Sequence, residues 1–275
     1  MSSRIRIYND AGCRTVQEGS VPDMGKYLNT GNAGFDSVKR SIYVDKTGMI
    51  AFINQTLGTS DKLTCVSRPR RFGKSYAAKM LCAYYDKSCD SRQLFEGLEI
   101  SRDASFETHL NKYNVIYLDI TLFISITADI TGIIREIESA VIEEVCRAFP
   151  GIERDDSLAG TLFNASAAAG EKFIMVIDEW DALFREAKND AKLQREYIDL
   201  LRSLFKSSWT DRIFEAAYMT GILPIKRYGT QSAVSDFREY TMLSPGRLVK
   251  YIGFTEPEVK ALCERYDMPF EEMKY

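Results

Sequence analysis

Gly73, Lys74 and Ser75 stand between a short apolar segment and a stretch with helical periodicity. They match the last three positions of GxxxxGK[ST], the pattern of a phosphate-binding loop. In such a loop the glycine lets backbone N–H groups face phosphate oxygens, the lysine reaches the β- and γ-phosphates, and the serine hydroxyl binds Mg²⁺. The first glycine of the pattern is replaced here by Arg68. The triplet alone is a weak signal, but its strand–loop–helix context predicts a site for a nucleoside triphosphate.

A second group of chemically capable residues follows the apolar run Phe173–Ile177, where the chain continues with Asp178 and Glu179. This is the form of a Walker B segment. Asp178 would hold Mg²⁺ opposite Ser75, directly or through water. Glu179 would polarise the water that attacks the γ-phosphate. Two acids at a strand end are also typical of a solvated turn or a helix cap, but together with the first group they favour nucleotide binding and hydrolysis.

The loop before the triplet is strongly basic, with arginines on both sides of a proline. Within a phosphate-binding loop these arginines would add positive charge around the triphosphate or contact its γ-phosphate. The alternative is solvated side chains without a fixed partner, and the sequence does not say which arginine points inward. The loop residues that we expect at the nucleotide are Arg68, Pro69, Arg70, Arg71, Phe72, Gly73, Lys74, Ser75 and Tyr76.

Polar residues at other expected strand ends leave two interpretations open. Thr220 is either a γ-phosphate contact, as P-loop ATPases often have there, or a buried threonine. Asp119 either lies near the Mg²⁺ or caps a helix, and Asp181 is assigned to capping the following helix. Trp180 is assigned to packing.

The composition excludes several classes of protein. The chain has 275 residues, of which 45% are hydrophobic and 27% are charged, as in globular domains. Lys and Arg total 36 against 39 Asp and Glu, a net charge of −3. This balance does not support coating of nucleic acid or of an anionic membrane, although a local basic groove remains open. His109 is the only histidine, so a His-rich zinc site is excluded, and we expect it on a short surface helix.

The sequence contains no stretch of about 18 apolar residues that would span a membrane. The first residues also lack the apolar stretch of a secretory signal. The 6 cysteines include no CxxC pair, which is typical of free thiols in a reducing compartment. We therefore expect a cytoplasmic protein with no membrane partner.

Apolar runs alternate with amphipathic stretches along the chain. This alternation predicts an α/β fold with a doubly wound, mostly parallel sheet of about five strands flanked by helices, and the loop makes it a P-loop NTPase. Residues 1–20 are expected to be a poorly ordered lead-in, 21–250 an ATPase-like domain and 251–275 a helical C-terminal extension. The expected strands are Lys62–Ser67, Asn114–Ile120, Lys172–Asp178, Phe214–Ile222 and Tyr240–Leu243. The expected helices are Lys74–Asp86, Asp129–Phe149, Ser157–Gly170, Asp190–Ser207 and Thr255–Tyr266.

With these motifs the chain resembles the bacterial AAA-ATPase-like family, P-loop proteins long grouped as a domain of unknown function. The resemblance runs from about residue 24 to the end, with the motifs in family order, and its RPRRFGKS loop is highly distinctive. The segments that carry it are YVDKT at 43–47, SRPRRFGKS at 67–75, LFEGL at 94–98, IDEWD at 177–181, TGI at 220–222 and GFTEPEV at 253–259.

The resemblance implies that the missing loop glycine is a family trait. It also implies phosphate and Mg²⁺ binding by residues 73–75, with Asp178 and Glu179 as the Walker B acids. The segment 43–47 resembles an element whose backbone borders the adenine in related ATPases, which adds Val44 and Asp45 to the expected nucleotide contacts. The residues themselves, 45–47, also fit a plain helix N-terminus, and the two interpretations are compatible. Family members usually continue into a nuclease-like domain, whose motifs are missing here, so we expect either a truncated chain or an ATPase module that acts alone.

Two functions of different classes fit these residues. In the first, Mg-ATP binds and is hydrolysed with Glu179 activating the water, and the cycle switches or drives an attached or partner domain. In the alternative, the chain is a non-hydrolysing nucleotide-binding scaffold or regulatory module, in a protein that processes nucleic acid. A small-molecule kinase would share the loop, but no lid or acceptor site is evident. No NKxD-type guanine motif is apparent, so we expect ATP and Mg²⁺ as ligands, and a second copy of the chain or another protein as partner.

Overall fold

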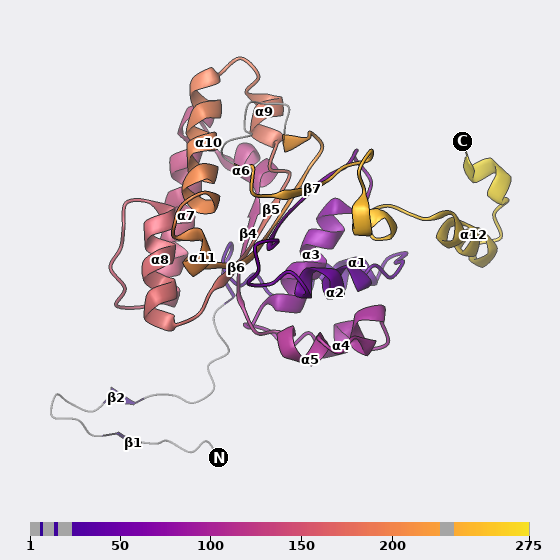
Figure 1. The fold of residues 1–275 in the computed structure, drawn as a ribbon, viewed down its shortest axis with the longest axis horizontal. Helices are drawn as coiled ribbons and strands as arrows, with labels where there is room; N and C mark the ends of the chain where they lie inside the picture. Colours follow the sequence, from indigo (N-terminus) through magenta and orange to yellow (C-terminus); the bar gives the residue numbers. More distant parts are fainter. Residues whose placement is uncertain (1–5, 8–13, 16–23, 226–233, 275) are drawn as a thin grey trace.

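The centre of the molecule is a sheet whose strands are β3 (Leu63–Ser67), β4 (Asn114–Asp119), β5 (Phe173–Asp178), β6 (Phe214–Gly221) and β7 (Arg238–Tyr240). The 5 strands lie in the order β4-β5-β6-β3-β7 (Figure 1). Every neighbouring pair runs parallel. The predicted α/β fold with a mostly parallel sheet flanked by helices is confirmed. The computed structural model describes residues 6–7, 14–15, 24–225 and 234–274.

Helices pack on both faces of this sheet (Figure 1). The α-helices are α1 (Ala33–Lys39), α2 (Gly48–Asn54), α3 (Lys74–Tyr85), α4 (Arg92–Phe95), α5 (Phe106–His109), α6 (Ile120–Ile126), α7 (Ile133–Ala148), α8 (Leu158–Ala169), α9 (Ala182–Glu186), α10 (Ala191–Phe205), α11 (Thr210–Ile213) and α12 (Glu256–Arg265). The 3₁₀ helices are η1 (Glu99–Arg102), η2 (Ile130–Gly132), η5 (Gly246–Lys250) and η6 (Phe270–Lys274).

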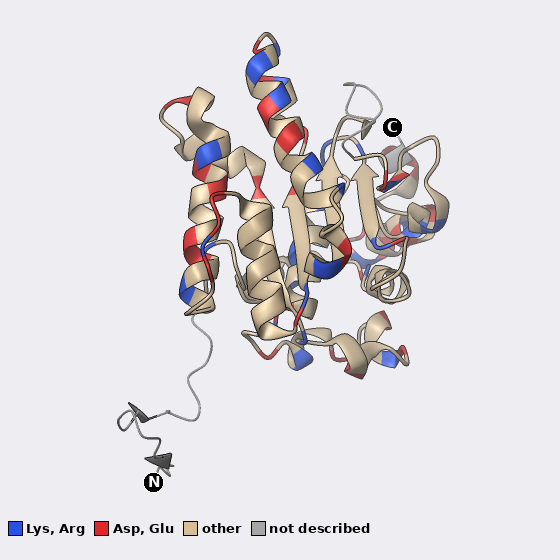
Figure 2. Ribbon diagram, turned by 60° about the vertical axis from the view of Figure 1, so that its left-hand side comes forward, with Lys and Arg blue, Asp and Glu red and all other residues tan. Residues whose placement is uncertain are grey.

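Two hydrophobic cores result, because successive side chains of a strand point to opposite faces. On β5, Phe173, Met175 and Ile177 belong to the core that also contains buried residues of α7, α8 and α10. Ile174 and Val176 belong to the opposite core, with buried residues of α1, α2 and α3. Figure 2 shows that the charged residues lie mainly in the helices and loops, while the strands contain few. The continuous apolar run of β5 is therefore that of a strand covered on both sides.

The long helices begin and end where the sequence places capping residues. Ser157 precedes α8, and its hydroxyl oxygen accepts a hydrogen bond from the N–H of Gly160 at 3.0 Å. Gly170 follows the same helix with φ of 66°, in the left-handed region that favours glycine. Thr255 and Glu258 form a capping box at the start of α12. These local signals explain why the predicted helix limits agree with the structure to within a few residues.

Replacing Gly170 by Ala should destabilise the protein by about 1 kcal/mol, because a side chain there occupies a left-handed backbone. A Cβ at this position would meet nothing within 4 Å, so the cost comes from the backbone alone. Gly132→Ala is the matched control, since Gly132 also has open space around it but has φ of −93°. Thermal unfolding of both variants checks this, and equal melting temperatures would contradict it.

One edge of the sheet is covered by the chain segment before α1. The N–H of Asn29 donates to the carbonyl of Val115 at 2.7 Å, and the N–H of Tyr117 donates to the carbonyl of Tyr27 at 2.8 Å. These bonds satisfy backbone groups of β4 that would otherwise form an open edge.

The strand predicted at Tyr240–Leu243 lies earlier in the chain than expected. β7 pairs with residues 64–66 of β3 through residues 238–240. The chain then turns, with the N–H of Thr241 donating to the carbonyl of Ser244 at 3.1 Å. Leu243 is 99% exposed. The apolar pair Met242–Leu243 thus belongs to a turn, because the register with β3 ends at Tyr240.

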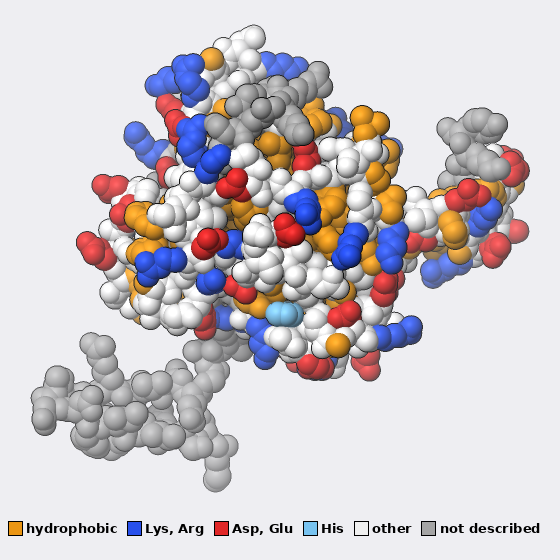
Figure 3. Space-filling model, in the orientation of Figure 1, with side chains coloured by type: hydrophobic (Ala, Val, Ile, Leu, Met, Phe, Trp, Pro, Cys, Tyr) orange, Lys and Arg blue, Asp and Glu red, His pale blue; other side chains and the backbone are white. Residues whose placement is uncertain are grey.

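The two ends of the chain bear on the predicted domain limits. Most of residues 1–20 lie outside the described residues, apart from the short antiparallel pair β1 (Arg6–Ile7) and β2 (Arg14–Thr15). The helix α12 projects away from the body of the molecule (Figures 1 and 3), and the division between 21–250 and 251–275 stays a prediction. No helix in the described ranges is long and apolar enough to cross a membrane. The described cysteines are free: Cys65, Cys82, Cys89, Cys146 and Cys263.

Candidate functional site

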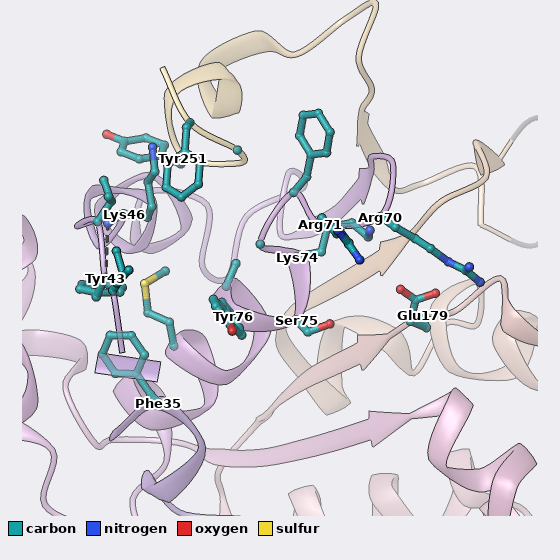
Figure 4. A pocket seen from close by; sticks show the side chains of 18 residues that line it. Phe35, Tyr43, Lys46, Arg70, Arg71, Lys74, Ser75, Tyr76, Glu179 and Tyr251 are labelled. Atoms are coloured by element: carbon teal, nitrogen blue, oxygen red, sulfur yellow. Dashed lines mark hydrogen bonds between the residues drawn. The ribbon is translucent and has the colours of Figure 1, made fainter. Parts of the chain in front are cut away.

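A pocket of about 440 Å³ lies beside the carboxyl ends of β3 and β5. Small-molecule sites typically enclose roughly 300–1,000 Å³, and ligands of open α/β sheets bind at this edge. Figure 4 shows two different ends of the pocket. Lys74, Ser75 and Glu179 lie at a charged end, whereas Phe35 and Tyr43 lie at an aromatic end.

The loop between β3 and α3 forms the charged end. Arg71 and Gly73 have φ of 69° and 76°, so the backbone turns sharply before the helix. No side chain caps the first turn of α3, which begins at Lys74 inside the pocket. The unsatisfied N–H groups and the positive end of a 12-residue helix therefore face the pocket. This is an arrangement that favours an anion such as phosphate.

Lys74 is the most enclosed cation of the charged end, with a relative exposure of 4%. Its Nζ donates a hydrogen bond to the carbonyl of Pro69 at 2.9 Å. Burial lowers the pKa of Lys74, although the negative charges of Glu179 and Asp178 oppose this effect. An ammonium group held this way gains more from a phosphate than one that is fully hydrated.

Arg70, Arg71, Phe72 and Tyr76 also line the pocket, as the sequence predicts. Arg70 extends toward Glu179, and Arg71 lies beside Lys74 (Figure 4). Both arginines are exposed to solvent.

The structure does not bring Arg68 to the pocket. Its N–H donates to the carbonyl of Gly221 at 3.0 Å, so Arg68 continues the pairing between β3 and β6. Its side chain is only 4% exposed and places Nη1 3.0 Å from the sulfur of Met242. Pro69 reaches the site only through the carbonyl that accepts from Lys74. The expected nucleotide contacts of these two side chains are therefore corrected.

Arg71→Ala should weaken Mg-ATP binding about tenfold, because one charge-assisted hydrogen bond is worth about 1.5 kcal/mol. Arg68→Met should leave binding unchanged and preserve or raise the melting temperature, since a buried guanidinium without a carboxylate partner in the described residues is costly. Equilibrium titration of both variants with Mg-ATP checks this. A larger loss of binding in Arg68→Met than in Arg71→Ala would contradict the placement.

Asp178 lies behind the pocket rather than on its surface, with an exposure of 2%. Its Oδ1 accepts hydrogen bonds from the hydroxyl of Thr220 and, at 3.1 Å, from the N–H of Glu179. The Tyr117 hydroxyl donates to Oδ2 at 3.4 Å. Thr220 is fully buried, and its hydroxyl holds the Asp178 carboxylate in place. The structure therefore agrees with the interpretation of Thr220 as a buried threonine.

Asp119 ends β4 directly beside the end of β5, where it pairs in register with Asp178. Its carboxylate accepts a hydrogen bond from the N–H of Leu122 at 3.0 Å and so caps α6. Burial raises the pKa of Asp119. The structure therefore agrees with the interpretation of Asp119 as a helix cap.

Glu179 follows β5 with a left-handed backbone, at φ of 53°. Its Oε2 accepts a hydrogen bond from Nη2 of Arg185, a residue that the sequence analysis missed. Burial raises the pKa of Glu179, and the charges of Arg185 and Lys74 oppose that rise. The spacing of Asp181 and Arg185, four residues apart at a helix start, is the signal that could have found this arginine.

The sequence analysis assigned Asp181 to capping the following helix, but its side chain makes no capping hydrogen bond to α9. Its fully buried carboxylate accepts hydrogen bonds from the N–H groups of Ile222 and Leu223, with the Leu223 bond at 3.0 Å. Trp180 is also fully buried and stacks edge-on with Phe184 at 5.7 Å, as the packing interpretation expects.

The aromatic end of the pocket combines segments far apart in the sequence. Tyr43 and Tyr251 lie at this end (Figure 4), and Tyr251 comes from the segment that follows η5. Val44 and Phe254 also line the pocket. Lys46 links the two segments, since its Nζ donates to the carbonyl of Lys250 at 2.7 Å and to the carboxylate of Glu258 at 2.6 Å. The contribution of Tyr251 and the two contacts of Lys46 were not predicted, because they join segments about 200 residues apart in the sequence.

Asp45 does not line this end. Its carboxylate accepts hydrogen bonds from the N–H and hydroxyl of Thr47 at 2.8 and 2.7 Å, and from the N–H of Glu99 at 2.6 Å. The side chain of Asp45 therefore fixes the start of α2, as the helix N-terminus interpretation expects, while a contact of Asp45 with the nucleotide stays a prediction.

Residues 34–230 match the family described as "Predicted AAA-ATPase". The chain belongs to this predicted AAA-ATPase family. The matched region of the chain contains the whole loop 68–76, Asp178 at the end of β5, Glu179 directly after it, and Thr220.

Three of the similar proteins share between 9% and 26% sequence identity with the chain. An uncharacterized protein in the vnfD 5' region of Azotobacter chroococcum mcd 1 is 26% identical over 223 residues, which are 80% of this chain and 41% of that protein. The chain thus spans less than half the length of this curated relative. A crystal structure of a DNA replication initiation factor has a TM-score of 0.38 at 9% identity, covering 84% of this chain and 55% of the other. The Aeropyrum pernix ORC2 protein, solved as ADPNP–ADP complexes, has a TM-score of 0.43 at 12% identity, covering 84% and 54%.

Proposed function

We propose that the chain binds Mg-ATP in this pocket and hydrolyses it. The observation that supports this best is the position of Lys74 and Ser75 at the uncapped start of α3, with Glu179 lining the same pocket. The triphosphate would lie along the loop, where Lys74, Arg70 and Arg71 supply positive charge. The adenine base of the nucleotide would lie at the aromatic end, near Tyr43 and Tyr251.

The residues present fit a nucleotide-bound Mg²⁺. This ion usually takes most of its ligands from phosphates and water, with one or two groups from the protein. Ser75 would supply its hydroxyl, and the buried carboxylate of Asp178 would act from behind the pocket, where Thr220 already orients it. When bound, Mg²⁺ offsets the negative charge that develops on the phosphate oxygens.

Glu179 would accept a proton from the attacking water, and Lys74 would stabilise the charge on the phosphate. The energy of the cycle would switch or drive an attached domain or a partner protein in the cytoplasm. Charges of both signs are interspersed over the face seen in Figure 3, which gives no support to nucleic acid as the direct partner.

Equilibrium binding of Mg-ATP and Mg-GTP to the purified chain tests the first half of this proposal. Trp180 is buried next to Glu179, so its fluorescence offers a signal for occupancy. We expect Mg-ATP to bind more tightly than Mg-GTP. If neither binds, the proposal fails; if Mg-ATP binds without phosphate release, the scaffold alternative replaces the hydrolase.

A further inference from the structure

Arg185 is the strongest feature of the site that the proposed chemistry does not use. It lies on the single-turn helix α9 and does not line the pocket. Its Nη2 donates to Oε2 of Glu179. Both side chains are largely buried, at 17% exposure for Arg185 and 21% for Glu179, so this is more than a solvated surface pair.

On its other side the guanidinium forms an ion pair with Asp181, without a hydrogen bond from Nε. Nε of Arg185 lies 3.2 Å from Oδ2 of Asp181, whose side chain is fully buried. The Asp181 carboxylate is in turn fixed by the backbone N–H groups of Ile222 and Leu223, just after β6. A Cβ on Gly221 would lie 2.8 Å from Oδ1 of Asp181, which shows how closely that carboxylate packs on the strand end.

The backbone of Glu179 is fixed as well. Its N–H donates to Oδ1 of Asp178 at 3.1 Å and to the hydroxyl of Thr220 at 3.3 Å. Its φ of 53° is unfavourable for a residue with a side chain and persists only where the surroundings impose it. The remaining freedom of Glu179 is the rotation of its side chain, and Arg185 restrains that rotation at Oε2.

We propose that Arg185, anchored by Asp181, is a positioning residue that holds Glu179 with Oε1 free toward the attacking water. The inference rests on the proposed hydrolysis. It adds that the side-chain position of Glu179, the general base, is set by the ion-paired series Asp181–Arg185–Glu179. This series connects the segment after β6 with the end of β5. Partners that orient metal ligands in this way are typically worth about 10–100-fold in activity, and we expect an effect of similar size for the orientation of Glu179.

The test compares kcat, KM and the equilibrium Kd for Mg-ATP in wild type, Arg185→Gln, Arg185→Lys, Glu179→Gln and the double variant Arg185→Gln/Glu179→Gln. We expect Arg185→Gln to lower kcat about tenfold with Kd unchanged, and Arg185→Lys to recover part of the loss. In the Glu179→Gln background the arginine substitution should cost nothing further, because both changes remove one function. Arg147→Gln, an exposed arginine paired with Glu143 on α7, is the control and should leave kcat unchanged.

Three results would overturn the inference: a kcat of Arg185→Gln equal to or above wild type, a loss that appears in Kd instead of kcat, or a full additional loss in the double variant. If Arg185→Gln does not fold, Arg185→Lys keeps the charge and gives the same comparison of kcat with Kd. A wild-type chain without turnover would defeat the proposed hydrolysis and this inference together. Normal wild-type turnover with an unaffected Arg185→Gln would defeat the inference alone.

Discussion

Glu179→Gln is expected to abolish phosphate release, with a loss of at least about a hundredfold, while Mg-ATP still binds. The amide keeps the shape of the side chain and can still meet Arg185, but it cannot accept a proton from water. Glu179 lines the pocket beside the loop, so no other acid is placed there to replace it among the described lining residues. Phosphate release and Mg-ATP titration on the same protein sample measure the two effects separately.

Glu186→Gln is the matched control for this result. Glu186 ends α9 a few residues further along, does not line the pocket, and should leave turnover unchanged. Equal turnover of Glu179→Gln and wild type would remove Glu179 from the chemistry. The chain would then be better described as a nucleotide-binding scaffold.

Lys74→Met is expected to weaken Mg-ATP binding about a hundredfold. The ammonium would contact phosphate in a largely desolvated setting, where a charge-assisted hydrogen bond is worth up to about 3 kcal/mol. Nζ of Lys74 donates a hydrogen bond to the carbonyl of Pro69, an uncharged acceptor that a phosphate oxygen would replace. Isothermal titration of both proteins with Mg-ATP measures the loss.

The same substitution should not destabilise the fold. Burial lowers the pKa of Lys74, which means that the folded state disfavours its charged form. A lysine with a lowered pKa reduces stability at neutral pH, and this penalty disappears as the pH rises toward the pKa of the unfolded chain. Lys74→Met should therefore keep or raise the melting temperature at pH 7, whereas a fall would show that lost packing dominates. Lys192→Met, at an exposed position on α10, is the control for both measurements.

Local signals were enough to predict most of the elements and the core of the site. The apolar run of β5 and the apolar residues that recur at helical spacing in α7 predict which side chains are buried. Such periodicity can be recognised within one element, without knowledge of the rest of the fold. Gly73, Lys74 and Ser75 could be placed at a helix start for the same reason. Glu179 followed from its position at the end of a buried strand, and Phe72, Tyr76 and Val44 also line the pocket as expected.

The sequence by itself therefore determined the α/β fold class, the loop and the two acids at the end of the β5 segment. Only the tertiary structure decided that Arg68 turns away from the pocket, that Asp45 fixes α2, and that Thr220 holds Asp178. It also brought Tyr251 to the aromatic end and Arg185 to Glu179. The physical reason is that these contacts depend on strand order and register, which are set by packing between elements distant in the chain rather than by any local pattern.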